Sequence, residues 1–313
     1  RKRCSNISWK QLPASFKSRS LPQVHLSEVS EESPFSLPLL LIMLSIFSYT
    51  FFQNALLGAL LSSVLCACIG TYVVTRRLVI AGGGMAHASL GGVGMGAYWG
   101  FSPIFGAACF ALASGLGIDW LSRKREVRGD SAIAMIWTLG MSIGILFAYL
   151  APGFMTDLPT YLFGDILSIS HSDLLAMGIL TAGTLLFFFL FERSIITLAY
   201  DRDFARTQGL PVRTLETILT ALTALTIVGC LRMVGIVMVI SLLSIPQLTA
   251  AVFTRTFRGM ILWSMVVGFA DCLGGLSLSY VLNVPSGAAI IVVSVVLYFV
   301  IRAIKALFQR FSS

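Results

Sequence analysis

The chain has 313 residues, of which 57% are hydrophobic and only 12% are charged, and its mean hydropathy is +0.88. A soluble domain carries roughly twice that fraction of charged residues, so the composition excludes a soluble globular fold. The net charge of +8 does not indicate a nucleic-acid-binding protein, because the basic residues fall in alternate loops and form no stripe beside stacking aromatics.

The first 35 residues differ from the rest of the chain. They are polar, begin with a basic run and end near the acidic residues Glu28, Glu31 and Glu32. No apolar segment follows the basic start closely, as a secretory signal would require. We expect a flexible N-terminal tail over residues 1–35 and one transmembrane domain over residues 36–310. The apolar stretch 37–48 is too short to span alone, so it either lies along the outer interface or extends the first helix.

From residue 51 onward, apolar stretches alternate with short polar loops. Each stretch is close to the roughly 20 residues that cross a hydrocarbon core of about 30 Å as a helix. The sequence therefore predicts an all-α, polytopic membrane protein of about eight or nine spans. The predicted spans lie near 51–75, 82–99, 101–121, 131–151, 171–192, 214–231, 233–254, 259–281 and 285–306.

The predicted span 82–99 is rich in glycine. Gly84, Ala88, Gly92 and Gly96 recur at every fourth residue, so on a helix they form one smooth stripe. In water, an interior glycine costs a helix up to about 1 kcal/mol relative to alanine. In lipid, small residues at this spacing let two helix backbones approach closely. We expect this stripe to pack against neighbouring helices or to border a transport path.

The two helix boundaries with the clearest polar signals lie near residues 173 and 246. Ser170 or Ser172 followed by Asp173 predicts a helix start, because a carboxylate is favourable near a helix N-terminus. Pro246 lies within the apolar run 233–254 and predicts an interrupted or kinked helix. The backbone carbonyls freed by such a break either line a cavity or bond to neighbouring helices.

The basic residues indicate how the spans are oriented. The loops near 100, 152–170 and 282–286 contain no Lys or Arg, whereas the loops on the other side are basic. The positive-inside rule therefore places the basic loops in the cytoplasm. Arg232 is the exception, and we assign it to an outer helix end. The residues on the basic side are Arg76, Arg77, Arg123, Lys124, Arg125, Arg128, Arg193, Arg202, Arg206, Arg213, Arg255, Arg258, Arg302, Lys305 and Arg310.

The cytoplasmic segment 200–211 has the features of a short helix between two spans. Asp201 or Asp203 can cap its start, and Gly209 can end it. Phe204 supplies an aromatic knob suited to docking into a groove of a partner protein. The alternative is an ordinary solvated turn. The candidate docking residues are Asp201, Arg202, Asp203, Phe204, Ala205 and Gly209.

Two ionisable side chains fall within predicted spans, where such groups mark functional sites. His87 is either a transient ligand for zinc, manganese or ferrous iron, or a buried histidine bonded to a backbone carbonyl. Asp271 either offers a carboxylate ligand to the same cation or is hydrogen-bonded to serines such as Ser264 or Ser277. Both residues are candidate metal ligands on a transit path, with the metal ion as cargo and no permanently bound cofactor.

Four blocks of sequence resemble one family, the bacterial ABC-importer permeases for zinc, manganese and iron, and the likeness covers about residues 50–300. The blocks are 76–87, 161–168, 201–211 and 234–246, with 283–288 beyond the last. The resemblance implies a type II-like helical bundle that pairs with a second permease copy, cytoplasmic ATPase subunits and an external metal-binding lipoprotein. Segment 201–211 is similar to the coupling helix of these permeases. They carry Gly-Asp-x-x-x-His at the first block, where this chain has Gly83 in place of the aspartate.

The absence of certain sequence motifs reduces the number of functions that the chain could have. The sequence contains no G-x-x-x-x-G-K-[ST] loop, so any ATP is hydrolysed by a separate chain and the permease is not itself an enzyme. The sequence predicts the permease of an ATP-driven importer for a divalent transition-metal ion. Three alternatives remain: a gradient-driven carrier or channel, an ABC permease for an iron chelate or vitamin, and a membrane-embedded enzyme. The absence of H-E-x-x-H and G-x-S-x-G motifs disfavours the last of these.

Overall fold

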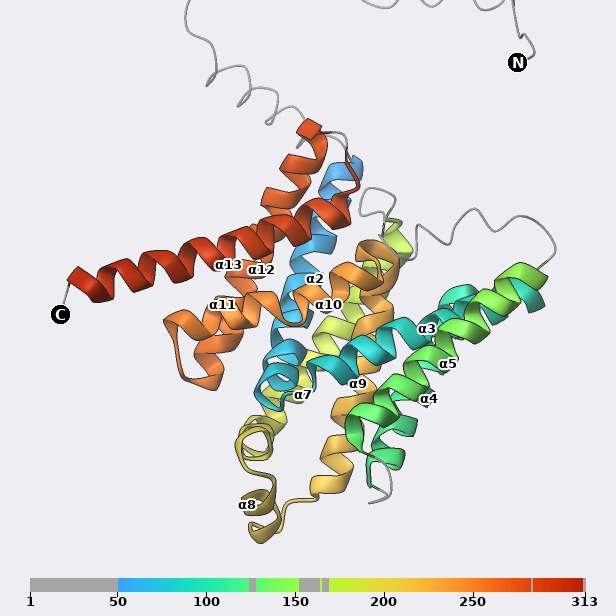
Figure 1. Cartoon of the computed structure of the whole chain (residues 1–313), viewed down its shortest axis with the longest axis horizontal. Helices are drawn as coiled ribbons and strands as arrows, with labels where there is room; N and C mark the ends of the chain where they lie inside the picture. Colours follow the sequence, from blue (N-terminus) through green and yellow to red (C-terminus); the bar gives the residue numbers. More distant parts are fainter. Residues whose placement is uncertain (1–49, 124–127, 152–163, 165–168, 283, 312–313) are drawn as a thin grey trace, which may run out of the picture. The chain divides into compact units, whose positions relative to one another are not determined.

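Helices account for the regular structure of every described segment (Figure 1). The computed structural model describes residues 50–123, 128–151, 164, 169–282 and 284–311, which belong to one unit over residues 45–313. The expected tail 1–35 and the stretch 37–48 lie outside these ranges. The helices are α2 (Thr50–Thr75), α3 (Val79–Trp99), α4 (Pro103–Arg123), α5 (Gly129–Leu150), α7 (His171–Tyr200), α8 (Arg202–Thr207), α9 (Val212–Val234), α10 (Ile236–Leu242), α11 (Ile245–Phe253), α12 (Phe257–Leu282) and α13 (Ser286–Phe311).

Eight stretches of the described chain are long and apolar enough to cross a membrane. They are α2, α4, α5, α7, α9, the pair α10 and α11, α12 and α13. Helix α3 is of similar length but falls outside the eight, because its glycines and His87 lower its hydropathy. Helix α7 continues to Tyr200 instead of ending near 192, and it has a kink at Phe191, beside the predicted end. The predicted all-α fold of about eight or nine spans is confirmed.

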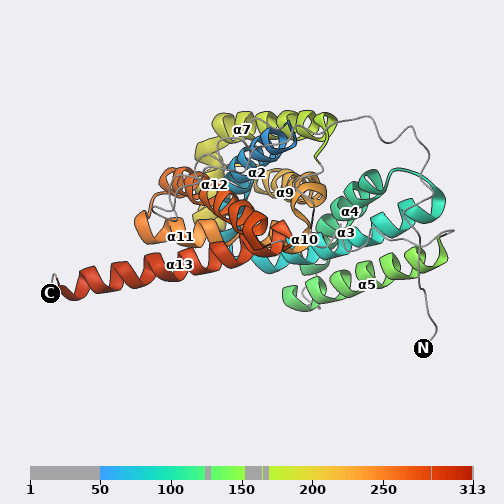
Figure 2. The same ribbon diagram turned by 90° about the horizontal axis from the view of Figure 1, so that it is seen from above.

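Glycines bring α3 into backbone contact with α4 and α5, and these three helices lie side by side in Figures 1 and 2. A Cβ added at Gly92 would lie 2.0 Å from the carbonyl oxygen of Gly106 in α4. A Cβ added at Gly94 would lie 2.2 Å from the carbonyl oxygen of Gly144 in α5. Both distances are shorter than van der Waals contact, so only glycine permits this approach.

The other members of the stripe also face neighbouring helices. A Cβ at Gly84 would lie 2.8 Å from a methyl group of Ile133, and one at Gly96 would lie 2.8 Å from the Cα of Pro103. Ala88 packs directly over Gly140 of α5. The stripe predicted from spacing is therefore a packing surface.

The predicted span 233–254 is built from two short helices, α10 and α11. Gly235, with φ of +78°, separates α9 from α10, and Pro246 lies in the first turn of α11. The side-chain amide of Gln247 donates hydrogen bonds to the carbonyl of Leu242 at 3.1 Å and to that of Cys66 in α2 at 2.8 Å. The carbonyl freed at the end of α10 thus gains a partner, as an interrupted helix within a membrane requires.

Gly164 is the one described residue of the block 161–168, and its surroundings explain why this position is a glycine. Gly164 has φ of +70°, and a Cβ at this position would lie 2.3 Å from the carbonyl carbon of Val234. Gly164 therefore packs against the turn that joins α9 to α10. A side chain at residue 164 would force the two segments apart.

Candidate functional site

The segment 200–211 contains the helix α8. The Asp201 carboxylate accepts hydrogen bonds from the backbone N–H groups of Asp203 and Phe204, each at 2.9 Å. This cap satisfies donors that a helix N-terminus leaves unpaired. Gly209, with φ of +74°, follows the helix and adopts the left-handed conformation that glycine favours. The segment is thus a helix rather than an irregular turn.

Helix α8 has one buried residue and an exposed aromatic side chain. Ala205 is fully buried, whereas Phe204 is 52% exposed. Asp203 and Arg206 form an exposed ion pair, with 3.4 Å between Oδ1 of Asp203 and Nη1 of Arg206. Helix α8 therefore presents Phe204 away from the bundle while Ala205 fixes the helix against it.

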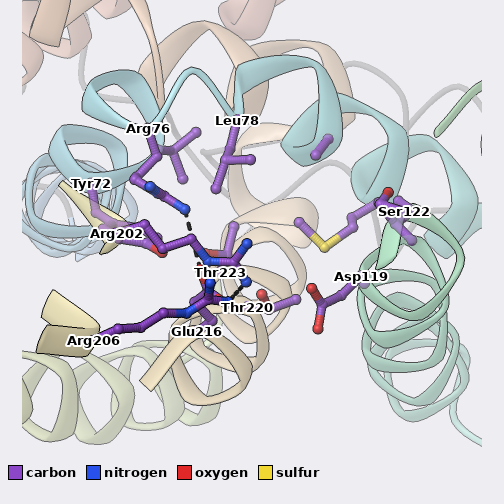
Figure 3. A pocket seen from close by; sticks show the side chains of 15 residues that line it. Tyr72, Arg76, Leu78, Asp119, Ser122, Arg202, Arg206, Glu216, Thr220 and Thr223 are labelled. Atoms are coloured by element: carbon purple, nitrogen blue, oxygen red, sulfur yellow. Dashed lines mark hydrogen bonds and ion pairs between the residues drawn. The ribbon is translucent and has the colours of Figure 1, made fainter. Parts of the chain in front are cut away.

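A polar cavity of about 600 Å³ lies beside α8 (Figure 3). It is lined by residues at the cytoplasmic ends of several helices, as the orientation predicted from the basic loops assigns them. The lining residues that carry charge are Arg76, Asp119, Arg202, Arg206 and Glu216. Figure 3 shows Asp119 of α4 on the opposite side of the cavity from the arginines.

Glu216 joins three elements at the wall of this cavity. It lies near the start of α9 and is 8% exposed. Its Oε1 accepts a hydrogen bond from Nη2 of Arg76 at 3.2 Å, and its Oε2 accepts one from Nη2 of Arg202 at 2.7 Å. We call this group the Glu216 bridge, consisting of Arg76, Glu216 and Arg202. Sequence reasoning missed Glu216, although it is the one carboxylate of α9.

His87 belongs to α3, and its side chain faces α5. Its ring stacks on Trp137 with the ring centroids 4.6 Å apart and the planes inclined by 8°. The imidazole Nδ1 is buried and makes no hydrogen bond to any described residue. Nδ1 therefore has no backbone carbonyl as a partner in the described chain, and both interpretations of His87 stay open.

Asp271 is fully buried on α12. The Ser294 side chain of α13 faces its carboxyl group, but neither carboxylate oxygen makes a hydrogen bond of normal geometry to a described residue. The hydroxyl of Ser264, one of the predicted partners, is likewise unpaired within the described part of the chain. Ser277 bonds instead to the carbonyl of Leu273.

The structure does not bring His87 and Asp271 together in one chain. Helix α3 packs mainly on α4 and α5, whereas α12 packs mainly on α2, α11 and α13. Across the described ranges, no group of three or more His, Cys, Asp or Glu side chains is arranged to hold a metal ion.

The predicted start of α7 is present. Ser170 accepts a hydrogen bond from the backbone N–H of Asp173 at 3.3 Å, and the backbone N–H of Ser170 donates to the Asp173 carboxylate at 3.2 Å. This reciprocal pair is a capping box. Asp173 therefore has a structural role at the helix start.

Known proteins resemble this chain over most of its length. Residues 48–305 match the model of the ABC 3 transport family. The chain is 38% identical over 263 residues to an uncharacterised membrane protein of Synechocystis, a match covering 84% of this chain and 94% of that protein. It is 30% identical over 261 residues to the manganese transport system membrane protein MntC of Listeria monocytogenes, covering 83% of this chain and 93% of that protein.

A solved structure shares the arrangement of helices. The structure of PsaBC from Streptococcus pneumoniae in complex with Fab superposes with a TM-score of 0.76 at 25% sequence identity, covering 84% of this chain and 95% of that chain. The family model, the relatives and the helical architecture agree. The chain belongs to the ABC 3 transport family and is a multi-pass membrane permease.

Proposed function

We propose that the chain is the permease subunit of an importer that carries a divalent transition-metal ion across the bacterial cytoplasmic membrane. ATP hydrolysis in separate cytoplasmic subunits drives the transport. The observation that carries this proposal is α8, a capped helix that presents the exposed Phe204 from a cytoplasmic loop. A short helix with a protruding aromatic is suited to a groove in a partner protein. The manganese transport role in the name of the Listeria relative supports a metal cargo.

Membership of the family supports two further partners in the proposal. An external metal-binding lipoprotein delivers the ion, and a second permease copy completes the path. The ion passes His87, whose Nδ1 has no hydrogen-bond partner in the described chain and whose imidazole suits zinc, manganese and ferrous iron. Asp271 is the second candidate ligand, because its buried carboxylate oxygens lack hydrogen bonds to described residues. The ion is cargo and is held weakly enough to be released.

Metal-resolved accumulation in cells tests the cargo. A strain that lacks the gene is complemented with the wild-type chain, and cellular manganese, zinc and iron are measured together. The proposal expects accumulation of at least one free ion to return. Restored uptake of an iron chelate or a vitamin, with no change in any free ion, would contradict the proposal and favour the chelate alternative.

A further inference from the structure

We infer that Glu216 is a positioning residue that transmits movement of α8 to the start of α3, the helix that carries His87. The inference rests on the proposed function, because it assigns to one carboxylate the link between ATPase docking and the transport path. It is drawn from the Glu216 bridge, which connects α8, α9 and the turn between α2 and α3.

Each carboxylate oxygen of Glu216 contacts a different element. Arg202 is the first residue of α8, and Arg76 lies just beyond the end of α2 and just before the start of α3 at Val79. The distances are 2.7 Å to Arg202 and 3.2 Å to Arg76. A displacement of either arginine therefore acts on the same carboxylate. Because Glu216 is 8% exposed, loss of one partner leaves a buried charge incompletely paired, which is costly.

The turn that carries Arg76 is held in a defined shape. The backbone N–H of Arg77 donates to the carbonyl of Val74 at 3.0 Å, and that of Leu78 donates to Val73 at 2.8 Å. Arg77 has φ of +59°, a left-handed conformation that is unfavourable for a residue with a side chain. These bonds fix the turn to the end of α2, and the backbone N–H of Gly82 joins it to the first turn of α3 by donating to the carbonyl of Leu78 at 2.9 Å. A displacement of Arg76 therefore also acts on the start of α3.

Helix α8 offers few other routes for such a movement. Ala205 is its buried residue, whereas Asp203, Phe204, Arg206 and Thr207 are exposed. A partner protein that binds Phe204 consequently acts on the bundle in three ways: through the backbone on either side of α8, through the packing of the buried Ala205, and through the Glu216 bridge. The bridge contacts the turn between α2 and α3 directly, through Arg76.

The bridge also forms part of the wall of the cavity in Figure 3. Gly115 and Asp119 of α4 line the same cavity, and Met85 reaches it from α3, two positions before His87. Movement of the bridge relative to α4 changes the width of this cavity on the cytoplasmic side. Glu216 thus links docking at α8 to the opening of the inner end of the path.

The test uses the complete transporter, with the permease and its ATPase in vesicles, and measures ions moved per ATP hydrolysed. Glu216→Gln preserves shape but removes the charge that both arginines share. We expect the number of ions moved per ATP to fall by at least about fivefold while ATP hydrolysis stays within about twofold of wild type. A merely structural role would lower both quantities together.

Glu192→Gln is the matched control. Glu192 of α7 forms a bidentate ion pair with Arg258 of α12 on the same side of the bundle, with Nη2 of Arg258 at 2.6 Å from Oε2. This pair does not involve α8. The ratio of ions to ATP should stay at the wild-type value in this variant. An equal fall in both variants would overturn the inference, since any cytoplasmic ion pair would then suffice.

A second variant decides the question if Glu216→Gln does not assemble. Arg76→Gln removes the α3 side of the bridge but retains the pair between Arg202 and Glu216. A lowered ratio in Arg76→Gln supports the inference, and an unchanged ratio overturns it. If the wild type pumps metal and the variants keep its ratio, the inference alone fails. If the wild type moves no metal with ATP, the proposed function fails as well.

Discussion

The glycines of α3 occupy two different environments, although they form one pattern in the sequence. A Cβ at Gly92 would meet the Gly106 carbonyl oxygen at 2.0 Å, whereas one at Gly82 would have no atom within 4 Å. Gly92→Ala should lower the thermal midpoint of unfolding in detergent, because overpacking costs about 1–3 kcal/mol. Gly82→Ala is the control and should hold or raise the midpoint, because alanine favours a helix by up to about 1 kcal/mol. Equal midpoints for the two variants would contradict the packing described for α3.

His87 allows a test of the transport path. His87→Ala should reduce metal accumulation by at least about tenfold, since it removes a nitrogen ligand from the path. Trp137→Phe is the control, because it retains an aromatic ring against the imidazole and should accumulate near-normal metal. The measurement is metal content per cell at equal amounts of permease in the membrane. Normal accumulation by His87→Ala would remove His87 from the path.

Local chemistry could be predicted from sequence, but distant partners could not. Asp201 and Asp173 cap helices as their short-range sequence context indicates. The bridge at Glu216 depends on Arg76, which lies 140 positions away in the chain. No periodicity within one helix reveals such a pair, because the folding of other segments brings its members together.

Helix α8 is the element that we propose docks the ATPase. Phe204→Asp should leave the protein in the membrane but abolish ATP-coupled uptake, since loss of a central aromatic anchor costs an interface at least about 2 kcal/mol. Gln208→Glu is the control, because it adds the same charge beside α8 and retains the aromatic side chain. Co-purification of the ATPase and uptake are both measured. Full uptake by Phe204→Asp would show that α8 does not dock the ATPase.

The interrupted helix shows how far sequence reasoning reaches at the scale of elements. Pro246 predicts a break in the run 233–254, and the structure has one between α10 and α11. The position of the break was predictable because a proline is favoured in the first turn of a helix. The partner of the freed carbonyl was not, since Gln247 bonds to Leu242 and also reaches Cys66 on α2.

At the scale of the whole molecule, hydropathy was sufficient to locate the spans. All nine predicted segments contain helix, and the short helix in 200–211 is also present. These features depend on composition within each segment. The separation of His87 from Asp271 depends instead on which helices pack together, and a single sequence does not contain that information. Which helices pack together was therefore less predictable than where the spans lie along the chain.

Transport by purified components tests the central claim most directly. The permease is placed in vesicles with and without its ATPase, and uptake of manganese, zinc and iron is measured with and without ATP. The account predicts metal uptake only when both the ATPase and ATP are present. Equal uptake by the permease alone, driven by an ion gradient, would contradict it.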